Sequence, residues 1–289
     1  MLNIGKIYIL CAYLLAGVYV EYLLKAILLG IIQGLTEFLP VSSSGHLVVF
    51  ANILNFQESG IAFEVFVHFG TLISVLVAFR KELGAMILAP YEVWVKKSEN
   101  EEIKEFLMWD FYIIVATIPA VIVGLFFKDQ IEQAFQSILL VFVMLLITGL
   151  LMFLTQYLKF RNVKFNFKNT FIIGIAQSFA ILPGISRSGS TIFTGMAQGM
   201  DREKVAKFSF IMSVPAILGA VVLKLNDMIN NPPLSSEITG IALGTLFSAI
   251  TGYLAIVLLM NVVKKGKLQW FGYYCFALGL IGLIWYFAR

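Results

Sequence analysis

The chain has 289 residues and a formal net charge of +4; 60% of its residues are hydrophobic and only 13% are charged. Soluble domains are about 45–50% apolar and about 25% charged, so a mean hydropathy of +0.89 excludes an ordinary water-soluble protein. We therefore predict an integral membrane protein embedded in a lipid bilayer. The small positive charge fits lysine- and arginine-rich cytoplasmic loops better than nucleic-acid binding, which we do not expect.

The long apolar stretches predict membrane-spanning α-helices, because about 20 largely uncharged residues cross the hydrocarbon core. A retained N-terminal helix is expected over 1–20, with a cleaved signal peptide as the alternative. The charged segment 81–105 is interpreted as a loop with an interfacial helix. Complete spans are predicted at 62–79, 107–127, 137–158, 205–224, 238–262 and 268–288.

Two further apolar segments are interrupted, and neither piece of either one is long enough to cross comfortably. Pro40 and a run of serines break the first segment, and Pro183-Gly184 breaks the second. We interpret each as a re-entrant hairpin of two half-helices, which survives at membrane depth only where protein or a water-filled cavity surrounds the turn. The half-helices are expected at 22–39 and 41–54, and at 170–182 and 188–200.

The two interrupted segments repeat each other at an offset of 144 positions, which is about half of the chain. Lysine and arginine place the loops 159–168 and 264–267 on the cytoplasmic side, and three crossings between the hairpins then invert the second one. We predict an all-α bundle in a single membrane domain over 1–289, with inverted-topology repeats at about 22–158 and 166–289 whose hairpin tips meet near the midplane. The matching stretches are Gly30-Ile31-Ile32-Gln33 with Gly174-Ile175-Ala176-Gln177, and Ser42-Ser43-Ser44-Gly45 with Ser186-Arg187-Ser188-Gly189.

Gln33 and Glu37 are four residues apart and therefore share one helical face. A carboxylate at membrane depth costs about 2.5–3.5 kcal/mol on insertion scales, so it is usually paired or functional. One interpretation is an acid that caps or packs a helix. The other is an oxygen ligand for a hard divalent cation, with Gln33 supplying a carbonyl and Glu37 a charge.

The second half-helix of each hairpin begins with serines, which are common helix caps. Two helix N-termini aimed at one point also suit an anion, and Arg187 adds a planar cation for phosphate oxygens. An ion pair between Arg187 and Glu37 is the structural alternative. His46 lies three residues after Ser43 on the same helical face, where it can act as the base for a serine nucleophile. This inventory fits phosphoryl transfer; His68 is interpreted as a lining or packing residue.

At these residues the sequence resembles the bacitracin-resistance type undecaprenyl-pyrophosphate phosphatases of bacteria. The resemblance covers about 22–289 and rests on two motifs, Gln33-Gly34-Leu35-Thr36-Glu37 with Pro40-Val41-Ser42-Ser43-Ser44-Gly45-His46, and Pro183-Gly184-Ile185-Ser186-Arg187-Ser188-Gly189. It implies a multi-pass enzyme of the inner membrane that removes one phosphate from C55 isoprenyl (undecaprenyl) pyrophosphate and regenerates the lipid carrier for cell-wall synthesis. It also implies a divalent ion, Mg²⁺ or Ca²⁺, and a site reached from the outer face.

Carried over by position, the resemblance implies a role for each motif residue. Gln33 and Glu37 would serve the metal, and Glu37, Ser43, His46 and Arg187 the catalysis. The pyrophosphate would be held by Ser42, Ser44, Gly45, Ser186, Arg187, Ser188 and Gly189. Whether Ser43 is phosphorylated or Glu37 activates a water stays open, as does a homo-oligomer. The rival functions are a secondary transporter or flippase of a lipid-linked phosphate, and an anion channel.

Overall fold

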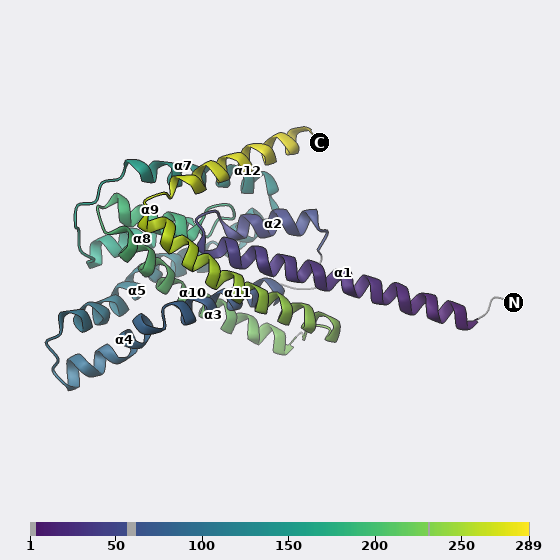
Figure 1. Ribbon diagram of the computed structural model, residues 1–289, viewed down its shortest axis with the longest axis horizontal. Helices are drawn as coiled ribbons and strands as arrows, with labels where there is room; N and C mark the ends of the chain where they lie inside the picture. Colours follow the sequence, from purple (N-terminus) through teal and green to yellow (C-terminus); the bar gives the residue numbers. More distant parts are fainter. Residues whose placement is uncertain (1–3, 57–61, 231, 289) are drawn as a thin grey trace.

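The computed structural model describes residues 4–56, 62–230 and 232–288, in which helices are joined by turns and loops and the one bridge is an isolated pair of Val163 and Met200. The all-α fold class is therefore confirmed (Figure 1). The elements are α1 (Ile4–Phe38), α2 (Ser43–Ile53), α3 (Ala62–Ala78), α4 (Arg80–Pro90), the π-helix η1 (Tyr91–Val95), α5 (Glu101–Phe126), α6 (Lys128–Gln136), α7 (Ile138–Leu154), the 3₁₀-helix η2 (Thr155–Tyr157), α8 (Phe167–Phe179), α9 (Arg187–Ala197), α10 (Arg202–Asn230), α11 (Ser235–Lys264) and α12 (Gln269–Ala288).

Several of these helices are long and apolar enough to cross a membrane. Within the described residues, five meet this test by length and composition: Gly17–Phe38, Glu101–Phe126, Ile138–Tyr157, Glu237–Lys264 and Gln269–Ala288. A sixth candidate consists of α3 together with Arg80–Val95, and this pair is bent by 77°. The membrane-spanning bundle is thus confirmed. Of the predicted complete spans, 62–79 meets the test only together with Arg80–Val95, and 205–224 is not among the five. The re-entrant path of the hairpins through a bilayer stays a prediction.

The predicted boundary between a helix at 1–20 and a half-helix at 22–39 is wrong, because α1 runs through it without a break. The charges that suggested a boundary pair with each other on the helix surface, with Lys25 Nζ 2.6 Å from Glu21 Oε1. The 35 residues of α1 measure about 52 Å at 1.5 Å per residue. The N-terminal part of α1 accordingly extends beyond the bundle in Figure 1. Residues 57–61, at the end of the first predicted hairpin, lie outside the described residues.

The segment 81–105 is also more helical than expected. It holds α4, η1 and the first turn of α5, which begins after Asn100 because the side chain of that residue accepts the N–H of Glu102 at 2.9 Å. Most of the charged side chains are exposed, and Lys96 pairs with Glu92 at 2.6 Å one turn away. The charge pattern therefore indicates a solvated helix surface rather than a loop.

The first arms of the two predicted hairpins pack along equivalent helices. In the first, α1 lies along α11; in the second, α8 lies along α5. The equivalent helices α3 and α10 contact each other, and so do α7 and α12, which run side by side in Figure 1. The second half-helices, α2 and α9, begin and end exactly 144 positions apart. The first arm of each hairpin is thus held in an equivalent way, whereas the second arms differ, since α9 packs against α10 and α2 has no comparable contact with α3.

Small residues bring the first arm of each hairpin close to its partner helix. A Cβ atom added to Gly30 of α1 would lie 2.8 Å from Cα of Gly244 in α11. A Cβ atom added to Gly174 of α8, the equivalent position, would lie 2.8 Å from Cα of Ala116 in α5. Such contacts allow dispersion attraction between backbones, which is a main source of helix association in lipid.

We expect Gly174→Ala to lower the unfolding temperature in detergent, because the added methyl group must push α8 away from the α5 backbone. Overpacking of this kind costs about 1–3 kcal/mol. The matched control is Gly124→Ala in α5, where an added Cβ meets no atom within 4 Å. Equal unfolding temperatures for the two variants would contradict the close packing.

Candidate active site

The first hairpin turns at 39–42, between α1 and α2. Ser42 caps α2, because its Oγ accepts the N–H of Gly45 at 3.3 Å. Its φ angle of 69° lies in the left-handed region, which is costly for a residue with a side chain and is found mostly at functional sites. This turn brings Ser43, the first residue of α2, back toward Glu37 at the end of α1.

The second hairpin turns between α8 and α9 in a related way. Gly184 adopts φ +96°, and Ser186 caps α9 by accepting the N–H of Gly189 at 3.1 Å. Thr148 of α7 ties the turn together, since its hydroxyl donates to the Gly184 carbonyl at 2.8 Å and accepts the Ser186 N–H at 3.0 Å. Backbone groups in the turn are thereby paired inside the protein, as a low-dielectric surrounding requires.

The tips of the two hairpins touch each other reciprocally. A Cβ at Gly45 would lie 3.1 Å from Cα of Gly184, and a Cβ at Gly189 would lie 3.2 Å from Cβ of Pro40. Helices α2 and α9 therefore begin next to each other, and their first turns carry amide groups that the helices themselves do not use. As the repeat pattern predicts, the two helix N-termini lie together.

The Glu37 carboxylate is the point at which four elements converge. Its side chain is 6% exposed, and Oε1 accepts a charge-assisted hydrogen bond from Arg187 Nη2 of α9. Oε2 accepts the Ser43 hydroxyl of α2 at 2.6 Å and the Gln33 amide of α1 at 2.9 Å. His68 Nε2 of α3 lies 3.6 Å from the same oxygen. A buried carboxylate with this many donors is strongly stabilised in its charged form.

A cavity of about 750 Å³ opens at this carboxylate. Its polar lining comes from the two hairpins and from α3 and α6, which add Glu64, His68, Glu132 and Gln136, whereas most of the exposed lining surface is apolar. This combination suits an amphipathic ligand with an anionic end. The lining residues are Glu37, Ser43, Ser44, Glu64, Val65, His68, Ala120, Ile131, Glu132, Phe135, Gln136, Gln177, Ala180, Ile181, Ile185, Ser186, Arg187, Ala216 and Ile217.

The predicted site residues divide into two groups. Five of them line the cavity: Glu37, Ser43, Ser44, Ser186 and Arg187. The others stand behind these residues in the framework of the two turns, and they are Gln33, Ser42, Gly45, His46, Ser188 and Gly189. The two turns repeat one further contact, because the cap hydroxyl lies 3.3 Å from Ser44 Oγ in the first and 3.2 Å from Ser188 Oγ in the second.

The predicted pairing of His46 with Ser43 does not form. His46 Nδ1 lies 2.8 Å from the Ser42 carbonyl oxygen, which can only accept, so Nδ1 carries the proton. In the neutral imidazole Nε2 then accepts the hydroxyl of Tyr274 in α12 at 2.7 Å. Both ring nitrogens are occupied, and the geometry makes His46 a residue that positions the turn. Ser43 has Glu37 as its hydrogen-bond partner instead.

Sequence reasoning missed several residues of the cavity. His68 lines the cavity, which confirms its interpretation as a lining residue, but its contact with Glu37 was not predicted. Gln177 lines the cavity, and its position 144 residues after Gln33 was a signal that could have identified it. Helix α6 contributes Ile131 and Phe135, for which the short predicted loop gave no signal.

Comparison with known proteins agrees with this geometry. The model of the family described as bacitracin resistance protein BacA matches residues 26–281, which include both hairpins and every residue of the site. The chain belongs to the BacA family. Proteins named undecaprenyl-diphosphatase are similar to it over most of their length. The one from Halothermothrix orenii is 41% identical over 263 residues, covering 90% of this chain and 96% of that protein. The one from Christiangramia forsetii is 43% identical over 270 residues, which cover 91% of this chain and 98% of that protein. The one from Methanobrevibacter smithii is 42% identical over 269 residues, which cover 90% of this chain and 96% of that protein.

The donor set of this BacA-family site fits a divalent cation only in part. Among the described residues, no three His, Cys, Asp or Glu side chains are grouped to hold a metal ion. Gln33 Oε1 is buried without a hydrogen-bond partner, but Gln33 does not line the cavity and its amide nitrogen faces Glu37. Mg²⁺ is often held by one or two carboxylates together with phosphate oxygens. Glu37 fits that arrangement, whereas a closed all-protein metal site does not form.

We expect Arg187→Gln to lower the free energy of unfolding by about 3–5 kcal/mol, because it leaves the Glu37 charge buried without its cation. Glu37→Gln should destabilise for the same reason. The double variant removes both charges and should cost less than the sum of the single variants by about 0.5–3 kcal/mol. Urea unfolding in detergent micelles measures the free energy of unfolding of the wild type, the two single variants and the double variant. Additive effects of the two substitutions would contradict a coupled ion pair.

Proposed function

We propose that this protein hydrolyses undecaprenyl diphosphate to undecaprenyl phosphate and inorganic phosphate, and so recycles a lipid carrier for cell-wall synthesis. The observation that carries the proposal is the hydrogen bond from the Ser43 hydroxyl to the Glu37 carboxylate, which is also paired with Arg187. These groups lie beside the N-termini of α2 and α9. A nucleophile, a base and an anion site are thereby within one cavity. The names of the similar proteins support the same activity.

In the proposed reaction the diphosphate competes with Glu37 for Arg187. Phosphate oxygens accept hydrogen bonds from the Arg187 guanidinium and from the backbone amides at the N-termini of α2 and α9. Glu37 then loses its ion pair with Arg187 and is available as a base. The Ser43 oxygen then attacks the terminal phosphorus while its proton passes to Glu37, and the bond to the bridging oxygen breaks to release undecaprenyl phosphate. Water hydrolyses the phosphoserine, which restores Ser43 and gives inorganic phosphate. Direct attack by a water that Glu37 activates is the alternative.

We propose that a divalent ion, Mg²⁺ or Ca²⁺, accompanies the diphosphate. Glu37 would hold it together with phosphate oxygens, and Gln33 would support Glu37 from behind through its amide. Such an ion neutralises phosphate charge. Arg187 and the helix N-termini provide the protein's own share of that neutralisation.

The substrate tail has a candidate exit from the cavity between α5 and α10. A second, almost entirely apolar cavity of about 310 Å³ lies in this seam and is lined mostly by isoleucine and valine side chains of α5, with Pro215 of α10. Neighbouring residues border both cavities, since Ala120 precedes Val121 and Pro215 precedes Ala216. The hydroxyl of Thr117, which also lines the seam, donates to the Ile113 carbonyl at 2.7 Å and leaves no free donor for a polar ligand.

The proposed location is the cytoplasmic membrane of the cell, with the active site open to the outer face. Lysine and arginine cluster in the loops 159–168 and 264–267, which short-loop charge bias places inside. The cavity is bordered instead by α6, which connects the spans 107–127 and 137–158. Because 137–158 leads into the inside loop 159–168, its other end and α6 are predicted to face outward.

A transporter or flippase remains the rival function, because broken helices that meet at the midplane are typical of transporters. Transport of a phosphate needs no nucleophile, so the bond between Ser43 and Glu37 favours hydrolysis. The two functions differ in a direct assay. A hydrolase releases phosphate in detergent solution, whereas a transporter requires sealed vesicles and leaves the diphosphate intact.

We expect Ser43→Ala, Glu37→Gln and Arg187→Gln each to lower kcat/KM for phosphate release by about 100- to 1000-fold or more, since each removes a group in contact with the reacting phosphate. Lys204→Gln is the matched control, because it removes a cation whose partner, Glu105, lies on the surface. Full activity of Ser43→Ala with loss in Glu37→Gln would select the activated-water route. Activity unchanged in all three variants would exclude the proposed site.

We expect Ala216→Phe, which places a large side chain at the border of the two cavities, to lower kcat/KM for the C55 substrate about tenfold or more. A C10 prenyl diphosphate is short enough to be hydrolysed at nearly the wild-type rate. The control is Gly219→Phe on the same helix, since Gly219 borders neither cavity and an added Cβ there meets no atom within 4 Å. An equal loss of kcat/KM with both substrates would contradict a path of the substrate tail through the seam between α5 and α10.

A further inference from the structure

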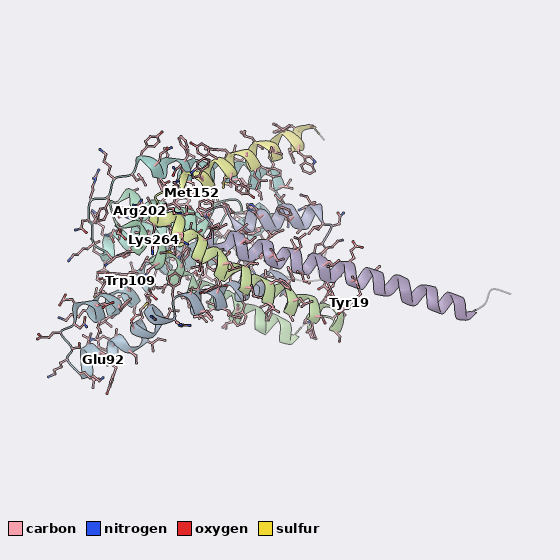
Figure 2. All side chains as sticks on the ribbon, viewed as in Figure 1. Tyr19, Glu92, Trp109, Met152, Arg202 and Lys264 are labelled. Atoms are coloured by element: carbon pink, nitrogen blue, oxygen red, sulfur yellow. The ribbon has the colours of Figure 1, made fainter. Side chains whose placement is uncertain are left out.

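A separate cavity of about 260 Å³ lies at the end of the bundle where α7 ends, α10 begins and α11 connects to α12. It shares no lining residue with the cavity at Glu37. Lys159 and Arg202 supply its charge, and Met196 and Leu268 part of its apolar wall. Figure 2 shows Arg202 at this end of the molecule, away from the N-terminal end of α1. Nothing in the proposed reaction uses this cavity.

Several cations around this cavity have no acidic partner among the described residues, and in this they differ from three nearby lysines of α10 and α11. Lys204, Lys207 and Lys264 each form an ion pair, with Glu105 at 2.7 Å, Glu82 at 2.8 Å and Glu203 at 4.0 Å. Within the described chain, in contrast, no acid lies within 4.0 Å of the charged groups of Lys159, Arg161, Arg202, Lys265 or Lys267.

One acid, Asp201, also lines the cavity, and its charge has a separate use. Its Oδ1 accepts the N–H of Lys204 at 2.9 Å in the first turn of α10, where the helix dipole offsets a negative charge. The cavity therefore keeps a surplus of positive charge. An anion is the ligand that this surplus attracts.

The side chains of Arg202 and Arg161 pack over two glycine turns beside the cavity. Gly266 has φ +65°, and the Arg202 guanidinium lies against the space that a side chain would occupy there. Gly199 has φ +88°, and the carbon atoms of the Arg161 side chain lie 2.8–3.2 Å from its ideal Cβ position. The Arg161 N–H also donates to the Gly199 carbonyl at 2.9 Å. Both arginine side chains thus pack over a glycine that leaves room for them.

The position of the cavity along the spans indicates where the anion comes from. The candidate spans Ile138–Tyr157 and Glu237–Lys264 end at the cavity, and Gln269–Ala288 begins there. Tyr157 and Trp270 are about two-thirds exposed at the same level, and tyrosine and tryptophan are typical of the boundary between lipid and water. Lipid phosphates lie at this boundary, and basic pockets between helices on the cytoplasmic side bind such head groups.

We infer that this cavity binds the phosphate head group of an anionic membrane lipid, with Lys159 and Arg202 as the residues that contact it. The ligand chemistry is a phosphate ester on a glycerol or similar small group. Free inorganic phosphate offers the same oxygens but gains nothing from the neighbouring lipid boundary. The site is independent of the proposed hydrolysis.

The test is a titration of the full-length protein in a neutral detergent with phosphatidylglycerol, phosphatidylcholine or inorganic phosphate. Native mass spectrometry counts bound lipid, and the unfolding temperature reports stabilisation. We expect saturable binding of phosphatidylglycerol about tenfold or more tighter than that of phosphatidylcholine, with a rise in the unfolding temperature. Inorganic phosphate should not displace the bound lipid at concentrations that leave the ionic strength unchanged.

Charge-removing variants separate a built site from general surface charge. Lys159→Gln and Arg202→Gln should each weaken phosphatidylglycerol binding about tenfold, whereas Lys168→Gln, an exposed cation near the same end that lines neither cavity, should change it less than twofold. Arg202→Lys keeps the charge and decides the case if Arg202→Gln does not fold. Equal effects of Lys168→Gln and Lys159→Gln, equal affinity for the two lipids, or displacement by inorganic phosphate would each overturn the inference.

Discussion

The ion pair between Glu37 and Arg187 is the interaction on which the rest of the structure depends, because it joins the two hairpins at their tips. Either charge alone at membrane depth costs about 2.5–3.5 kcal/mol on insertion scales. The fold lowers this cost by bringing the tips together, and Ser43 and Gln33 add hydrogen bonds that satisfy the same carboxylate. The arrangement that makes the hairpins stable therefore also assembles a cation, a base and a hydroxyl.

The turns themselves follow from the need to pair backbone groups away from water. Ser42 and Ser186 cap α2 and α9, and Thr148 pairs with the backbone on both sides of the second turn. Capping leaves the first amides of each helix without a partner inside the helix, so that an anion can accept their hydrogen bonds. Structural and chemical roles are thus carried by the same short stretches of sequence.

Much of this site was predictable because its key residues lie in two local motifs at a fixed offset. The hairpins, the meeting of their tips and the closeness of Glu37 to Arg187 all follow from that repeat. The hydrogen-bond partner of His46 could not be predicted in this way, because helical spacing gives the face on which a side chain lies but not the direction of its ring. The partner, Tyr274, is 228 residues away in the sequence. The continuity of α1 was missed because the pair of Glu21 and Lys25 looks like a boundary in the sequence, although on a helix surface it is accommodated. Helix α6 at the cavity is a tertiary feature without a local signal.

The occupants of the equivalent positions 43 and 187 differ, and this has an evolutionary consequence. A symmetric dimer of one half would present the same side chain at both positions, either two hydroxyls or two guanidinium groups, and neither pair gives a nucleophile next to an anion clamp. Fusion of the halves into one chain frees each copy to specialise, and the backbone has diverged too, with φ 69° at Ser42 but −76° at Ser186. The same asymmetry is found at Glu37, whose equivalent position in the second hairpin holds Ile181, so the carboxylate, the hydroxyl bonded to it and the guanidinium paired with it each come from only one of the two hairpins.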